Sequence, residues 1–287
     1  MARKGLGSVL RRLNKDAEEG KSFSVVSEID KACRAGIMDA TAFSLGGIRK
    51  QLDVLQGLLA KDEFNRDEFF SQFHVLYALV MGPDRRAKGV FHPSQLLDGC
   101  LRQMAYDLSG EKPTDEVYRG ISAEIQRTFN VGTWYHVYMQ GILYKLGLLE
   151  AAEVPVVNKE KYLNGKADGV FKTEVYGEKV VLEIKTMNDF IYKKAVFRPF
   201  AKHEFQASLY ARELGAKKVL YLYINKNTSE IKEFLMPVNE EQLKVADKKM
   251  NTVIESLHTK ALPKRTCEDK MCDDAMACPF RTLCFGK

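Results

Sequence analysis

Apolar side chains recur at spacings of three and four residues over the first part of the chain, as in amphipathic helices. We predict helices within residues 23–38, 48–64 and 67–81. The following segment, GPDRRAKG at 82–89, combines glycine, proline and charge, which indicates a linker. The pattern therefore predicts a helical N-terminal region, residues 1–85, and a second domain, residues 90–287.

The second domain begins with a predicted turn and helix over 91–110, in which Ser94 is the expected N-cap and Gly110 the stop. A helical stretch with a break near Gly132 comes next, and short runs rich in Val and Ile then indicate strands. In chain order we expect a helix at 116–148, strands at 151–157, 165–172 and 179–186, a helix at 202–214, strands at 218–225 and 230–238, and a helix at 240–258. The tail has few aliphatic residues and is predicted to be an irregular loop. This succession predicts an α/β fold.

Composition adds little about partners. The 287 residues carry 44 basic and 38 acidic side chains, a net charge of +6. Residues 1–90 hold 15 basic and 12 acidic side chains and the rest hold 29 and 26, so the excess is spread evenly. Charge permits a polyanionic partner without requiring one. The longest apolar run, 73–81, is about half of a membrane span, and the N-terminus has no apolar signal core. We expect a cytoplasmic protein that has no membrane partner.

Two acidic residues and a lysine form the first candidate site. Asp168 lies in one predicted strand, and Glu183 and Lys185 lie in the next, in the order D, fourteen residues, E-x-K. Because side chains alternate along a strand, Glu183 and Lys185 share a face and Ile184 points to the core. Paired carboxylates suit a hard divalent ion, and a lysine can stabilise charge on a phosphate. A solvated hairpin is the alternative. Glu153, in the preceding strand, could add an acidic group to the site, but it is expected to face solvent.

Cysteines form the second candidate site. Four of the six lie within the last 21 residues, at positions 267, 272, 278 and 284. In a reducing compartment clustered thiols more often bind metal than form disulfides. Zinc held by the four tail cysteines is one possibility, with Cys100 a buried structural thiol. Cys33 lies in a predicted helix and is expected to be part of the core.

Further motifs flank the acidic pair: His136 in GTWYH, and Gln206 and Tyr210 in QASLY, four residues apart on one helical face. The order GTxxH, D, E-x-K, QxxxY resembles the PD-(D/E)XK nuclease superfamily, in particular its RecB-like branch, over residues 90–287. The resemblance implies a central mixed sheet flanked by helices. It implies magnesium or manganese bound by His136, Asp168, Glu183 and the carbonyl of Ile184, with Lys185 catalytic and Gln206 and Tyr210 supporting the site. Ala167 replaces the proline of the superfamily's name.

The segment from Ser94 to Tyr106, S…CxRxxxY, resembles the iron-sulfur members of this branch, which include CRISPR-adaptation exonucleases and the AddB nuclease domain. That resemblance implies a [4Fe-4S] cluster held by Cys100 and three tail cysteines. CPFRTLC matches the spacing of the last two, Cys278 and Cys284, whereas Ala275 occupies the position of the usual third cysteine. Cys267 and Cys272 both remain candidates for that ligand, and structural zinc remains the alternative.

A basic and aromatic stretch follows the E-x-K strand. Tyr192, Phe197 and Phe200 offer rings for stacking unpaired bases, and a solvated loop with aromatics in the core is the alternative. The residues predicted to contact DNA phosphates are Lys193, Lys194, Arg198 and Lys202.

Together these features predict a divalent-metal-dependent deoxyribonuclease, an exonuclease that acts on DNA that is single-stranded or has a free end, in replication, recombination or processing. The alternative is a nuclease-like module that binds or recruits DNA with little catalysis. The N-terminal region is expected to dock a replication or recombination protein. Analogy alone suggests that a bacteriophage encodes the chain.

Overall fold

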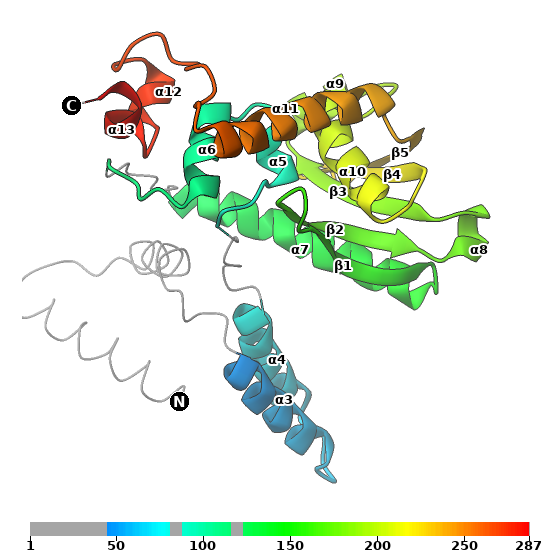
Figure 1. Cartoon of the computed structure of the whole chain (residues 1–287). Coiled ribbons are helices and arrows are strands. Elements are labelled where there is room, and N and C mark those ends of the chain that lie inside the picture. Colours follow the sequence, from blue (N-terminus) through cyan, green and yellow to red (C-terminus); the bar gives the residue numbers. More distant parts are fainter. Residues whose placement is uncertain (1–44, 81–87, 116–122, 287) are drawn as a thin grey trace, which may run out of the picture. The chain divides into compact units, whose positions relative to one another are not determined.

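The computed structural model describes residues 45–80, 88–115 and 123–286, and the chain divides into two compact units (Figure 1). The described part of the first unit contains α3 (Leu45–Leu59), α4 (Arg66–Val80) and the start of α7, to residue 130. Leu55 and Leu58 are buried, and the amide of Gln51 donates to the backbone oxygen and the side chain of Gln72 at 2.9 and 3.0 Å. The predicted helix at 23–38, Cys33 and most of the linker lie outside the described residues.

The second unit is built on a five-stranded sheet with the order β1-β2-β3-β4-β5. β3 and β4 are parallel, and the other neighbouring pairs are antiparallel. This confirms the predicted α/β class with a central mixed sheet flanked by helices. The elements of the unit are α5 (Pro93–Leu96), α6 (Leu101–Ser109), α7 (Ala123–Lys145, from residue 131), β1 (Leu149–Asn158), β2 (Leu163–Phe171), α8 (Thr173–Tyr176), β3 (Val180–Met187), α9 (Asp189–Lys194), α10 (Ala201–Glu213), β4 (Lys218–Asn225), β5 (Ile231–Pro237), α11 (Glu240–Thr259), α12 (Asp273–Met276) and α13 (Arg281–Phe285).

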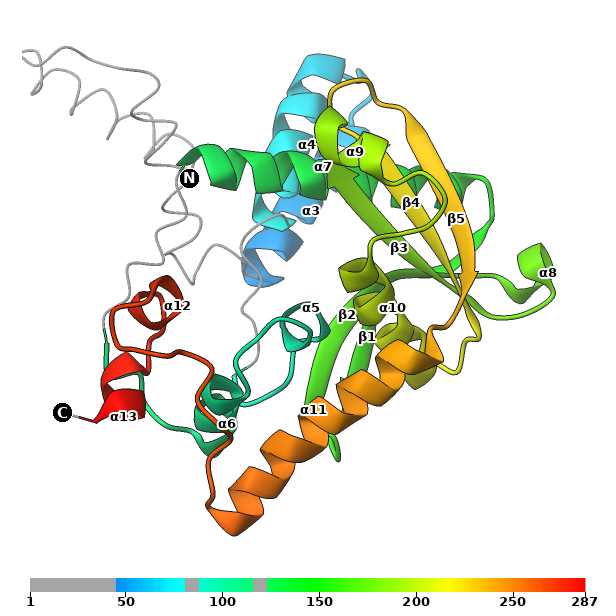
Figure 2. The same cartoon turned by 90° about the horizontal axis from the view of Figure 1, so that it is seen from above.

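Helices cover both faces of the sheet, as Figure 2 shows from above. On one face, Ala207 and Tyr210 of α10 pack in a buried cluster with Val181 of β3. On the other face, Met139 of α7 packs in the cluster that contains Ile184. Successive residues of β3 thus enter opposite layers, and water is excluded from both sides of the strand.

β2 and β3 pair over a short distance only. The register joins Gly169 to Leu182 and Val170 to Val181. Asp168 and Glu183 lie next to the Gly169–Leu182 pair, at the end where the pairing stops. The strands therefore separate at the two acidic positions, which leaves room between them for polar side chains.

Four local expectations have clear outcomes. Gly110 ends α6 with φ of 77°, as predicted. Ser94 is not an N-cap, because the helix starts at Pro93, whose fixed φ favours the first helical position. Gly132 does not break α7; a Cβ there would lie 3.1 Å from Thr186 Oγ1, so the glycine permits close packing on β3. The tail is not wholly irregular, since it contains α12 and α13.

Among the described residues, no helix is both long and apolar enough to cross a bilayer.

Gly165 of β2 provides a test of this packing. A Cβ at this position would lie 2.6 Å from Cε1 of Tyr210, so Gly165→Ala must displace a buried ring. We expect the substitution to lower the free energy of unfolding by roughly 1–3 kcal/mol, measured by urea denaturation. Gly141→Ala is the control: a Cβ there meets nothing within 4 Å, and alanine favours the helix. Equal stability of the two variants would contradict the packing.

Candidate active site and cysteine cavity

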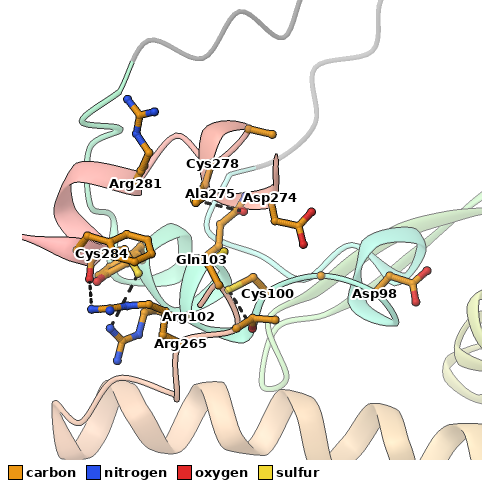
Figure 3. A pocket seen from close by; sticks show the side chains of 16 residues that line it. Asp98, Cys100, Arg102, Gln103, Arg265, Asp274, Ala275, Cys278, Arg281 and Cys284 are labelled. Carbon is orange, nitrogen blue, oxygen red and sulfur yellow. Dashed lines mark hydrogen bonds between the residues drawn. The ribbon is translucent and has the colours of Figure 1, made fainter. Parts of the chain in front are cut away.

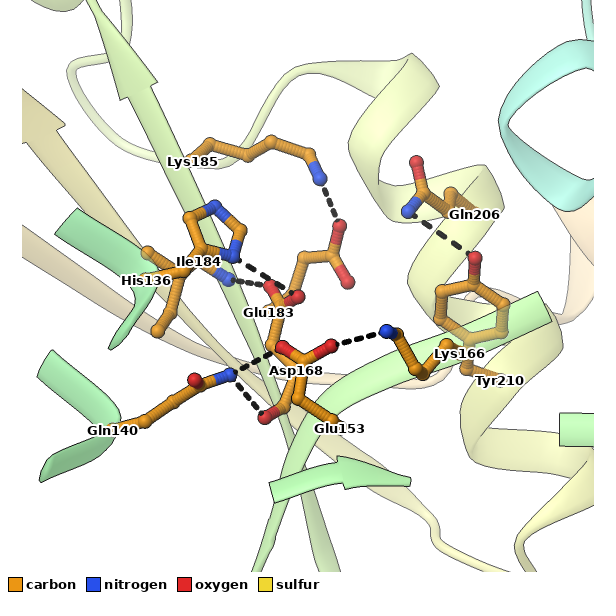
Figure 4. A network of polar contacts seen from close by, with 10 residues as sticks. All are labelled: His136, Gln140, Glu153, Lys166, Asp168, Glu183, Ile184, Lys185, Gln206 and Tyr210. Carbon is orange, nitrogen blue, oxygen red and sulfur yellow. Dashed lines mark hydrogen bonds and ion pairs between the residues drawn. The ribbon is translucent and has the colours of Figure 1, made fainter. Parts of the chain in front are cut away.

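Four of the predicted site residues converge from α7, β2 and β3: His136, Asp168, Glu183 and Lys185 (Figure 4). His136 Nδ1 lies 3.2 Å from Asp168 Oδ1. The backbone N–H of Ile184 donates to Asp168 Oδ2 at 2.6 Å. The ammonium of Lys185 contacts Glu183 Oε1. One helix and two strands thus bring a histidine, two carboxylates and a lysine into one network.

Burial and the neighbouring charges together set the pKa values in this network. Glu183 is 1% exposed, and burial raises its pKa to about 7 despite the neighbouring ammonium of Lys185. Its second oxygen, Oε2, is buried and has no hydrogen-bond partner. Burial also acts on Asp168, but His136 and Lys185 outweigh it and lower the pKa of this carboxyl. The pKa of Lys185 is raised, because the attraction of Glu183 and Asp168 outweighs burial. The site therefore holds a protonated lysine beside an unpaired carboxylate oxygen.

Glu153 lies beside this group. Its side chain is 46% exposed, so it faces solvent as expected and also contacts the site. Ligand atoms of His136, Glu153 and Asp168 all lie within 4.8 Å of one another, and Glu183 is not part of this set. Gln140 Nε2 donates to Glu153 Oε1 at 2.8 Å and to the Asp168 carbonyl at 2.9 Å. Lys166 Nζ lies 2.6 Å from Glu153 Oε2. The φ of Glu153 is 51°, a left-handed value that is rare for a glutamate. Nothing in the sequence pattern signals this bend in β1.

Gln206 and Tyr210 lie on α10 above the network. Gln206 Nε2 donates to the Tyr210 hydroxyl at 3.4 Å. Tyr210 is buried, and burial raises its pKa to about 12, so it remains a neutral phenol. The resemblance implies that this pair supports the site. Whether it acts in catalysis stays a prediction.

The stretch predicted to contact DNA forms α9 and the start of α10. Arg198 binds both oxygens of the buried Glu204 at 2.9–3.3 Å, and Lys193 pairs with Asp189 at 2.7 Å. Lys194 Nζ lies 4.0 Å from the centre of the Phe190 ring, and Lys202 is exposed.

The rings of this stretch differ in access. Tyr192 is 4% exposed, and Phe200 stacks on Tyr223 at 5.8 Å, so neither presents a ring for base stacking. Phe197 is 90% exposed. The backbone around it is held: Lys232 Nζ donates to the Ala195 carbonyl at 3.0 Å. The Phe200 N–H donates to the Tyr223 hydroxyl at 2.8 Å.

Four cysteines line one cavity of about 300 Å³ (Figure 3). They are Cys100, Cys267, Cys278 and Cys284; Cys272 does not line it. Arg102 Nη1 lies 4.0 Å from Cys284 Sγ, and Arg265 Nη2 donates to the Cys284 carbonyl at 2.8 Å. Burial, with a hydrogen bond to Cys272, raises the pKa of Cys267 to about 11. Cys100 precedes the strands of the sheet in the sequence and the other three cysteines follow them, yet all four line the same cavity.

Asp115 fastens the tail beside this cavity. Its carboxylate accepts from the Thr282 N–H at 2.7 Å, from the Thr282 hydroxyl at 2.8 Å and from Arg281 Nη2 at 3.2 Å. The Pro279 carbonyl accepts from the N–H groups of Thr114 and Asp115 at 2.9 and 3.1 Å. The bonds to the Asp115 carboxylate, led by the one from the Thr282 N–H, lower its pKa to about 2.

Comparisons with known proteins give distant likenesses only. No protein-family model matches the chain, and no curated protein does. The crystal structure of SSO0001 has a TM-score of 0.43 and 17% identity, covering 76% of this chain and 95% of that one. The alkaline exonuclease LHK-Exo from Laribacter hongkongensis has a TM-score of 0.45 and 9% identity, over 60% and 89% of the two chains. Its complex with dAMP has the same score and coverage at 12% identity. These likenesses are too distant to indicate an activity.

The Asp115 contacts predict a pH dependence of the tail. Because the pKa of Asp115 falls from about 3.9 in the unfolded chain to about 2, its contribution to stability is complete above about pH 4 and is lost as the pH falls through 2. We expect Asp115→Ala to increase cleavage of the tail by protease at pH 7. We also expect the variant to remove part of the decrease in the urea midpoint between pH 4 and 2. Glu111→Ala, an exposed neighbour, is the control. Identical pH profiles of wild type and Asp115→Ala would exclude this role.

Proposed function

We propose that the protein is a divalent-metal-dependent deoxyribonuclease of the exonuclease type. The observation that carries the proposal is the buried Glu183 Oε2, which has no partner, next to Asp168 and a protonated Lys185. An unsatisfied buried carboxylate oxygen is costly, and such features gather at functional sites. The exonuclease mode rests on the motif resemblance alone.

The residues fit magnesium or manganese. Carboxylate and carbonyl oxygens are the ligands these ions prefer. The resemblance assigns His136, Asp168, Glu183 and the carbonyl of Ile184 to one ion. We propose Asp168, Glu183 and the Ile184 carbonyl as its ligands, because His136 groups with Asp168 and not with Glu183. The unpaired oxygen of Glu183 is the donor that an ion would complete. Bound there, a divalent ion neutralises phosphate charge and lowers the pKa of its water.

The chain's own groups then account for the remaining chemistry. Hydrolysis adds water to the phosphorus and breaks one P–O ester bond, so negative charge grows on the phosphate oxygens. Lys185 keeps its proton and can donate to such an oxygen. Asp168 and His136 hold each other in place, and the Ile184 N–H fixes the second Asp168 oxygen. Tyr210 and Gln206 line the site on the side of α10. Lys202 and Phe197, both exposed, are proposed to contact DNA. Lys193, Lys194 and Arg198 are exposed too, although each also contacts a neighbouring side chain.

Cleavage of end-labelled DNA tests the proposal. With magnesium or manganese, wild type should degrade linear single- or double-stranded DNA, and EDTA should stop it. Lys185→Ala should reduce the rate by at least about 100-fold, because transition-state charge loses its donor. Asp168→Ala should abolish cleavage. Lys172→Ala, an exposed lysine on the turn after β2, is the matched control and should keep the wild-type rate.

The substrate form separates the modes of action. An exonuclease leaves covalently closed circles intact, whereas an endonuclease cuts them. A wild-type rate for Lys185→Ala would contradict the catalytic assignment. DNA binding with no cleavage by wild type, in either metal, would favour the binding module instead.

We also propose that Cys100, Cys267, Cys278 and Cys284 hold an iron-sulfur cluster. The support for this ligand set is the cavity that the four cysteines share. Cys272 does not line the cavity, and it is a hydrogen-bond neighbour of Cys267. Zinc, with Zn–S bonds of about 2.3 Å, would place tetrahedral sulfurs about 3.8 Å apart. No three of the described cysteines approach within 4.8 Å. A four-iron cluster binds each thiolate to a different iron and needs wider spacing. The docking role of residues 1–85 stays a prediction.

Metal analysis of protein purified without oxygen tests the cluster. We expect a brown protein with about four iron atoms per chain. Cys267→Ser should lose iron, and Cys272→Ser, a matched change in the same tail, should retain it. Stoichiometric zinc without iron would reverse the assignment. Equal iron loss from both variants would make Cys272 a participant.

A further inference from the structure

We propose that Glu153, together with His136 and Asp168, forms a second divalent-cation position beside the one at Glu183. The inference deepens the proposed nuclease site, on which it rests, and adds a ligand that the motif order does not contain. Asp168 would be shared by both positions, because its carboxylate has one oxygen near His136 and the other at the Ile184 N–H.

The first argument is the distance between donor atoms. Ligands of one magnesium ion lie about 2.1 Å from it, so no two of them are more than about 4.2 Å apart. The ligand atoms of His136, Glu153 and Asp168 lie within 4.8 Å of one another, which exceeds this limit by no more than about 0.6 Å, so small side-chain shifts can bring them onto one ion. Among the residues that the structure describes, no other group of three His, Cys, Asp or Glu meets that distance. Glu183 lies outside the group, so its unused oxygen belongs to a neighbouring position.

The second argument is the unpartnered oxygen itself. Glu183 is 1% exposed and its Oε2 has no hydrogen-bond partner, so this buried oxygen lacks the cation or hydrogen-bond donor that it needs. Asp168 has a ligand atom within 4.8 Å of one of Glu153, and its other oxygen accepts from the N–H of Ile184, the residue after Glu183 (Figure 4). A row of three carboxylates can bind two ions that share the central one. Two ions about 3.5–4 Å apart can stabilise both the attacking and the leaving oxygen of a phosphoryl transfer.

The third argument is how firmly Glu153 is held. The buried amide of Gln140 binds Glu153 Oε1 and the Asp168 carbonyl together, which fixes the two residues relative to each other. The other oxygen of Glu153 pairs with Lys166, whose side chain is 46% exposed. An ammonium at this oxygen occupies the place of a cation and can move aside into solvent when one binds.

Manganese binding by the full-length chain, without DNA, tests the proposal. Mn²⁺ is titrated and the free ion is followed by electron paramagnetic resonance, with circular dichroism to check folding. Wild type should bind two ions per chain, with the spectrum of a coupled pair. Glu153→Gln should bind one, and Glu150→Gln, an exposed carboxylate on the same strand, should bind two. Glu183→Gln should also retain one ion, the one held by His136, Glu153 and Asp168.

Lys166→Met provides a second variant that does not alter a ligand. If Lys166 competes with a cation at Glu153, its removal should tighten the weaker Mn²⁺ site; an unchanged affinity would count against the proposal. Two ions bound by Glu153→Gln with wild-type affinities would overturn it. A single wild-type ion that Glu183→Gln removes and Glu153→Gln retains would overturn it while leaving the nuclease proposal intact. Two bound ions with no DNA cleavage would sustain it and defeat the nuclease proposal.

Discussion

The structure of the sheet unit depends on the burial of charge where β2 and β3 separate. Glu183 is almost wholly enclosed, and an enclosed carboxylate is tolerated only when its surroundings supply charge or hydrogen bonds. Lys185 supplies both for one oxygen, and Asp168 is held by His136 and a backbone N–H. α7 must therefore lie close enough to β3 to deliver the imidazole, and α10 must close the other face. Gly132 and Gly165 make these approaches possible, since side chains there would meet Thr186 and Tyr210.

The same place collects the features that weaken a folded protein. Glu153 adopts a left-handed backbone conformation, which costs of order 1–3 kcal/mol for such a residue. Glu183 Oε2 lacks a partner. By contrast, the clusters packed by Tyr210 on one face and Met139 on the other are continuous and apolar. The stabilising apolar contacts thus lie in the two helix–sheet layers. The strained backbone of Glu153 and the unpaired oxygen of Glu183 lie between these layers, as expected of a site that binds a ligand.

Sequence periodicity predicted the parts of the fold that follow from side-chain alternation and helical spacing. It placed Glu183 and Lys185 together and Ile184 in the core, because the period of a strand fixes that outcome. It failed where long-range packing decides. Gly132 continues a helix because β3 lies against it, and α12 and α13 form in a tail that is docked through Asp115. The left-handed φ of Glu153 in β1 is also not encoded by any local pattern.

The contacts of the tail also predict an order of events in folding. Arg102 reaches the Pro263 carbonyl across 161 residues, and Asp115 reaches Thr282 across 167. Closing a loop of that length lowers the chain's entropy before any contact compensates, so such contacts form after the intervening sheet has shortened the path. The cavity lined by Cys100 and the tail cysteines is consequently among the last parts to be completed. An inorganic group placed there enters a largely folded scaffold, which makes its delivery a maturation step rather than the nucleus of folding.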